Sequence, residues 1–138
     1  MNIYLDIDGV LIHDSLKNYQ KIANGVVDFL RVITEKHNCY WLTTHCKGDT
    51  IHTLEYLNDR LPIEARQYIN LIKSTDWRTW KTEAIDFSED FRWIDDETYE
   101  PELEKLREHH CEDKLIRVNL EQNPNSLIEI GKLINKND

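Results

Sequence analysis

Four aspartates form two closely spaced pairs, Asp6 with Asp8 and Asp95 with Asp96. Along a strand, residues i and i+2 project to the same side, so Asp6 and Asp8 are expected to converge. Gly9, which follows them, permits a tight change of direction. Carboxylates held close together stay ionised only beside a counter-charge, most simply a hard cation such as Mg²⁺ that prefers oxygen ligands. The two acidic pairs therefore predict a magnesium site.

Polar residues of other types follow further apolar runs. Thr43 and Thr44 end one run, and a hydroxyl there can donate to a phosphoryl oxygen. Lys81 begins a segment of helical pattern, from which its ammonium group can return toward the strand ends. Taken singly, each feature has an ordinary alternative: a surface turn for the first acidic pair, a helix cap for the second, a solvated charge for the lysine and a simple strand end for the threonines. Their joint occurrence at successive strand ends favours a common site.

Short apolar runs alternate with segments of helical period, which predicts an α/β domain with a doubly wound, mainly parallel sheet of five strands. The expected strands span residues 3–7, 39–43, 68–72, 91–95 and 114–120. The expected helices span residues 24–37 with Asn24 as N-cap, 49–59, 80–87, 101–110 and 126–134. Between the first strand and the first helix, an irregular flap is expected from Gly9 through Ser15. Sheets of this kind bind ligands outside the carboxyl ends of their strands.

At these positions the sequence resembles the haloacid dehalogenase superfamily. Its four ordered motifs are similar to Asp6-Ile7-Asp8-Gly9-Val10-Leu11, the hydroxyl of Leu42-Thr43-Thr44, Lys81, and Trp93-Ile94-Asp95-Asp96. The resemblance covers the chain from the first expected strand to the fourth. It implies a Rossmann-like three-layer sandwich in which the first strand is central and adjacent to the fourth, so that both acidic pairs meet over one Mg²⁺.

The resemblance also implies a role for each motif residue. Asp6 is the expected nucleophile, which forms an aspartyl-phosphate, and Asp8 is the general acid that protonates the leaving oxygen and then the base that activates water. The presence of Asp at both position 6 and position 8 resembles the phosphatase branch of the superfamily. Thr43, or Thr44 if the register differs by one, binds the phosphoryl group, and Lys81 offsets its charge. Mg²⁺ is held by Asp95 and Asp96 together with Asp6 and the backbone carbonyl of Asp8.

The expected function is therefore a Mg²⁺-dependent phosphomonoester hydrolase of unidentified phosphorylated substrate. There are 34 residues between Asp8 and Thr43 and 36 between Thr44 and Lys81, too few for a sizeable cap domain. An uncapped site is open, and in the family that the chain resembles this often accompanies large substrates such as proteins or nucleic-acid ends, or closure of the site by a second subunit. A phosphotransferase, a receiver-like phospho-acceptor and a non-catalytic binding module of the same fold are the alternatives. The receiver reading is disfavoured because the receiver's phosphorylated Asp follows the third strand, where this chain has Ile72-Lys73-Ser74.

Length and composition set broader limits. The 138 residues predict one domain over residues 1–138, and a formal charge of -9 argues against extended contact with a nucleic-acid backbone. Three cysteines without a CxxC pair argue against a disulfide framework and for a reducing compartment. With neither a signal-peptide pattern nor an apolar run of membrane-spanning length, the chain is expected to be soluble, cytoplasmic and free of membrane contact.

Several other side chains could line such a site, although each also has a structural explanation. His13 lies in the expected flap, and His45 and Cys46 follow the threonines. Trp77 and Trp80 could contact a substrate, but packing is the favoured role for both. Zinc binding by His109, His110 and Cys111 is disfavoured, since neighbouring helical residues point in different directions.

Overall fold

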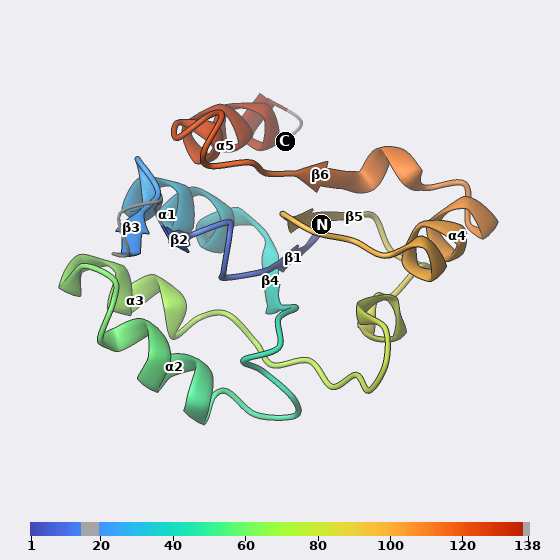
Figure 1. Ribbon diagram of the computed structural model, residues 1–138, viewed down its shortest axis with the longest axis horizontal. Coiled ribbons are helices and arrows are strands. Elements are labelled where there is room, and N and C mark those ends of the chain that lie inside the picture. Colours follow the sequence, from blue (N-terminus) through green and yellow to red (C-terminus); the bar gives the residue numbers. More distant parts are fainter. Residues whose placement is uncertain (15–19, 137–138) are drawn as a thin grey trace.

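A four-stranded parallel sheet forms the centre of the protein, whose computed structural model describes residues 1–14 and 20–136 (Figure 1). Its strands lie in the order β4 (Asn38–Trp41), β1 (Asn2–Leu5), β5 (Phe91–Asp95) and β6 (Leu115–Arg117). β1 pairs in parallel with β4 on one side and with β5 on the other. The expected parallel α/β architecture is confirmed, and the carboxyl ends of β1 and β5 lie side by side.

Helices lie over four of the five expected segments, the exception being residues 80–87. The helices are α1 (Val26–Lys36), α2 (Ile51–Asn58), α3 (Arg66–Ile69), α4 (Glu100–Glu108) and α5 (Ser126–Lys136), with 3-10 turns η1 (Ile63–Ala65), η2 (Lys81–Ala84) and η3 (Glu112–Lys114). The N-cap of α1 is Gly25 rather than the expected Asn24. Asn24 instead donates its side-chain N–H to Asn125 Oδ1 at 2.9 Å, which joins the start of α1 to the segment before α5. The helix expected over residues 80–87 is only the short turn η2.

The prediction of a strand over residues 68–72 is wrong, and the sheet has four strands rather than five. Ile69 and Ile72 are both buried, whereas Leu71 is 59% exposed. A strand would turn Ile69 and Ile72 to opposite faces, whereas a helical turn places residues three apart on the same side. Lys73, which follows this turn, exchanges two backbone hydrogen bonds with β4: its carbonyl accepts from the Trp41 N–H at 2.8 Å, and its N–H donates to the Cys39 carbonyl at 2.9 Å.

Both faces of the sheet are buried, which explains why its strands are nearly continuous apolar runs. Ile3 and Leu5 project into one core together with residues of α1 and α5. Tyr4 projects into a second core, with Trp93 of β5 and Leu106 of α4. Because successive β1 side chains are packed on opposite faces, the register of the strand is fixed and so is the direction of the residues that follow it.

The segment after β1 contains a small antiparallel hairpin in place of the expected irregular flap. β2 (Ile12–Asp14) pairs with β3 (Gln20–Ile22), and Ser15, the expected end of the flap, lies outside the described residues. Ahead of the hairpin, Gly9 has a positive φ of 82°. Among the described residues, no helix has the length and apolar character needed to cross a membrane.

Candidate functional site

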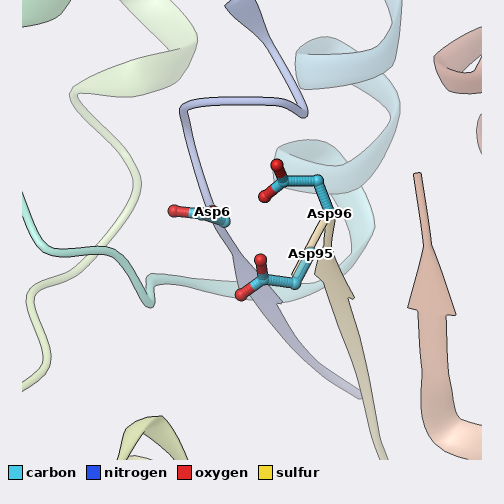
Figure 2. Close-up of side chains that lie close together, drawn as sticks. All are labelled: Asp6, Asp95 and Asp96. Carbon is cyan, nitrogen blue, oxygen red and sulfur yellow. The ribbon is translucent and has the colours of Figure 1, made fainter. Parts of the chain in front are cut away.

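Three carboxylates meet at the carboxyl edge of the sheet. Asp6 follows β1, Asp95 ends β5 and Asp96 comes next, and Figure 2 shows their side chains turned toward a common space. One oxygen from each can be chosen so that all three lie within 4.8 Å of one another. Asp6 is 7% exposed and Asp95 is fully buried. An all-carboxylate set of this kind suits a hard divalent cation such as Mg²⁺, although the donors alone do not distinguish it from other oxygen-seeking ions.

Lys81 supplies positive charge to this acidic cluster. Its Nζ lies 2.7 Å from Asp95 Oδ2 and 3.4 Å from Asp6 Oδ2. Its backbone N–H donates to Glu102 Oε2 at 2.9 Å, and the other oxygen of Glu102 accepts from the Tyr99 N–H at the start of α4. η2 is thereby fastened to α4, which fixes the direction from which the lysine enters the site.

The Asp95 carboxylate is held by the chain on both oxygens. Oδ2 accepts from the Trp93 indole N–H at 3.1 Å as well as from Lys81, and Oδ1 accepts from the Glu97 N–H at 3.1 Å. A buried carboxylate with this many donors is retained in its orientation. Asp95 is therefore the fixed member of the acidic cluster.

The acidic cluster carries more negative charge than Lys81 can offset. Burial, followed by the charge of Asp95, raises the pKa of Asp6 well above its usual value. Restricted solvation, again with Asp95, raises the pKa of Asp96 to about 6. The pKa of Lys81 is raised, because the attraction of Asp6 and Asp95 outweighs the opposing effect of burial. Each shift has the sign expected of a site that lacks positive charge and would gain from a bound cation.

Gly9 is required by the approach of Asp96. A Cβ on Gly9 would overlap the Asp96 carboxylate, and the positive φ of Gly9 is one that other residues adopt at a cost. The turn after β1 can therefore lie against the acidic cluster only with glycine at this position.

Asp8 is not a member of the acidic cluster, so the expected convergence of Asp6 with Asp8 is not found: β1 ends at Leu5, and the alternation of a strand does not extend to these residues. Its Oδ1 accepts from the Tyr56 hydroxyl at 2.7 Å, and its Oδ2 lies 2.7 Å from His45 Nε2. The side chain is 55% exposed. Of the four aspartates that the sequence selects, three therefore come together through their side chains, and the fourth occupies a neighbouring position at the same strand end.

The two threonines have different surroundings. Thr44 is exposed and lines the pocket that contains the acidic cluster. Thr43 is 1% exposed, and its Oγ1 accepts from the His45 N–H at 3.3 Å. The pocket thus presents the hydroxyl of Thr44, while that of Thr43 stabilises the turn after β4; the assignment of a phosphoryl ligand between them stays a prediction.

Two pockets adjoin the site. The first, of about 370 Å³, contains the acidic cluster, Lys81 and Thr44. The second, of about 520 Å³, lies between the β2 side of the hairpin and the segment after β6, and it is lined by His13, Asn119 and Glu121 among others. Asp8 and Asp96 line both pockets, so Asp8 stands at the boundary between them.

The remaining candidates are distributed unevenly. His13 lines the larger pocket and Trp77 the smaller one, whereas Cys46 is fully buried with its thiol directed at the Asp49 carbonyl. Trp80 packs near Tyr99, with ring centroids 6.0 Å apart. His109 stacks on Phe87, and within residues 1–14 and 20–136 the acidic cluster is the one group of at least three close potential metal ligands.

Two contacts of the site were not anticipated from the sequence. Tyr56 was not among the candidate residues, yet its hydroxyl donates to Asp8. Glu102 was not expected at the site, although it is 2% exposed and accepts a hydrogen bond from the Lys81 N–H. Glu at the third position after Tyr99, in the first turn of α4, is the one available signal, because an acidic residue there can cap a helix start.

No protein-family model matches the chain, and neither a curated protein nor a solved structure matches it.

Proposed function

We propose that the protein is a Mg²⁺-dependent phosphatase that acts on phosphomonoesters through Asp6. The observation that carries the proposal is the convergence of Asp6, Asp95 and Asp96 within 4.8 Å, with Lys81 in contact with two of them. Burying Asp6 and Asp95 beside a third carboxylate, that of the exposed Asp96, with one ammonium group between them is costly unless further positive charge binds. A divalent cation would supply that charge. Together with Lys81 it would also provide positive charge to bind the oxygens of a phosphoryl group.

The proposed reaction has two steps. Asp6 attacks phosphorus, and the bond from phosphorus to the leaving oxygen breaks while that oxygen takes a proton from Asp8. Asp8, now a carboxylate, then removes a proton from water as the water oxygen attacks phosphorus and the bond to Asp6 breaks, which returns both aspartates to their initial state. A carboxylate nucleophile thus divides one difficult displacement into two easier ones.

Each remaining residue has a place in this scheme. Asp6, Asp95 and Asp96, with the backbone carbonyl of Asp8, would hold Mg²⁺, which when bound polarises the phosphoryl oxygens. Lys81 offsets charge on Asp6 and on the transferred group. Thr44 offers a hydroxyl from the pocket wall. The position of Asp8 between the pockets supports its role, since a general acid must lie between the phosphoryl group and the leaving group.

The larger pocket is the proposed place for the leaving group. Its volume of about 520 Å³ accommodates a small organic phosphate or the end of a larger phosphorylated molecule. The order of the motifs, which resembles that of the haloacid dehalogenase superfamily without a cap domain, further supports the proposal.

The experiment that tests the function is a phosphatase screen with Mg²⁺ over sugar phosphates, mononucleotides, phosphopeptides and nucleic acids with 3′- or 5′-phosphate ends. We expect turnover with Mg²⁺, its loss on chelation, and its loss in Asp6→Asn. Beryllofluoride, which mimics an aspartyl-phosphate, should bind the native protein and not this variant. Absence of both turnover and beryllofluoride binding would exclude the proposal, and labelling by a small phosphodonor without turnover would support a phospho-acceptor domain instead.

A further inference from the structure

Asp8 is held by two side chains from outside the first motif, His45 and Tyr56. His45 Nε2 lies 2.7 Å from one carboxylate oxygen, and the Tyr56 hydroxyl donates to the other at 2.7 Å. Because both oxygens of the Asp8 carboxylate make a contact, rotation of this carboxylate would break one or both of them.

His45 and Tyr56 are themselves fixed with respect to each other. Their rings stack with centroids 4.0 Å apart and planes inclined by 19°. The Arg60 guanidinium covers the Tyr56 ring at 3.8 Å from its centroid and donates to the Tyr56 carbonyl at 3.0 Å. Arg60, Tyr56 and His45 therefore form a column of stacked groups beside Asp8.

The backbone of His45 is anchored from both sides. Its N–H donates to Thr43 Oγ1 at 3.3 Å, and its carbonyl accepts from Thr53 Oγ1 at 2.8 Å. Thr53 is fully buried and lies one helical turn before Tyr56 on α2. One helix thus places both partners of Asp8, Tyr56 directly and His45 through Thr53.

We propose that His45 and Tyr56 are positioning residues that hold the Asp8 carboxyl group at the boundary of the two pockets, where it meets the leaving oxygen. This inference rests on the proposed phosphatase function. The two residues contact neither phosphorus nor Asp6; they restrict Asp8 to the orientation in which its proton passes to the leaving oxygen as the bond to phosphorus breaks. Orientation of a reacting group to within a fraction of an ångström is worth a large rate factor.

The test uses the dependence of kcat/KM on the leaving group. This constant reports the step that forms the aspartyl-phosphate, in which Asp8 donates its proton. An alkyl phosphate needs that proton because its leaving oxygen is basic, whereas p-nitrophenyl phosphate releases a stable anion and needs it little. Tyr56→Phe retains the ring stack and loses the hydroxyl, and His45→Ala loses the second contact. In both variants we expect kcat/KM to fall about 10- to 100-fold for the alkyl phosphate and less than about threefold for p-nitrophenyl phosphate.

Two further variants separate positioning from general damage. His45→Gln retains an amide donor and should recover part of the loss seen in His45→Ala. His52→Ala, which changes a histidine of α2 with an 86% exposed side chain, should match the native protein on both substrates. Equal losses on the two substrates, or no loss on either, would overturn the inference while leaving the phosphatase function intact. If the native protein hydrolyses neither substrate nor any member of the wider panel, the function fails and the inference fails with it.

Discussion

Metal affinity should fall steeply on acidification, because the proposed ligands of the metal-free protein hold protons at unusually high pH. Burial and mutual repulsion raise the pKa of Asp6 well above its usual value and that of Asp96 to about 6. A metal must displace these protons, so its apparent affinity scales with the fraction of each ligand that is ionised. With a pKa of about 6, that fraction for Asp96 falls about tenfold between pH 7 and pH 5. Proton competition at Asp6 should steepen the decline further.

The assay is a titration of the purified protein with Mn²⁺, followed by electron paramagnetic resonance, since Mn²⁺ accepts the same oxygen ligands as Mg²⁺. Calorimetry with Mg²⁺ in two buffers of different ionisation enthalpy gives the number of protons released. Near pH 6, binding should release about half a proton from Asp96. Circular dichroism at each pH shows that the fold is retained.

Asp96→Asn is the matched control, because it removes one titrating ligand and keeps the size of the side chain. Its affinity should be lower than native at pH 7, and its decline toward pH 5 should be shallower by about tenfold. An affinity that changes less than twofold between pH 7 and pH 5, or binding without proton release, would refute the reasoning that the acidic cluster is the metal site.

Three further predictions concern the acidic cluster. Asp6→Asn should raise the melting temperature of the metal-free protein more at pH 7 than at pH 4, because a carboxyl group whose pKa is raised by burial destabilises the fold increasingly as the pH rises; a scan at both pH values checks the sign. Lys81→Met should lower the free energy of unfolding by about 3 kcal/mol in urea titrations, because Asp6 and Asp95 lose their cationic partner. Gly9→Ala should weaken Mn²⁺ binding at least tenfold, since its methyl group displaces Asp96; an unchanged affinity would show that this carboxylate is not a ligand.

The sheet and the acidic ends of its strands could be predicted because each rests on a local pattern. The apolar run before Asp6 and the run of β5 before Asp96 mark strands buried on both faces, and parallel strands share one carboxyl edge. The convergence of Asp6, Asp95 and Asp96 then needs only that β1 and β5 be neighbours. The adjacency of β1 and β5 was implied by the family resemblance rather than by any pattern in the sequence.

The prediction of a third strand was wrong for a local reason. The segment 68–72 has the composition of a strand, but its buried residues Ile69 and Ile72 are spaced for a helical turn. With so few residues, composition and spacing give opposite answers, and packing decides between them. The hairpin after Gly9 was missed since β2 and β3 have only 3 residues each, too few for an alternating pattern.

The contacts that surround Asp8 could not be predicted from local sequence patterns. Tyr56 is separated from Asp8 by 48 positions in the sequence, and its place on α2 suits either an apolar contact or a hydroxyl donor. The choice depends on how α2 docks, which is set in part by the bond from the buried Thr53 hydroxyl to the His45 carbonyl. A motif of aspartates can be found from spacing because its members lie on one strand or on neighbouring strands. The side chains that orient Asp8 come from the turn after β4 and from α2, both distant from it in the sequence. The orientation of Asp8, on which the proposed acid and base chemistry depends, is therefore a property of the tertiary structure.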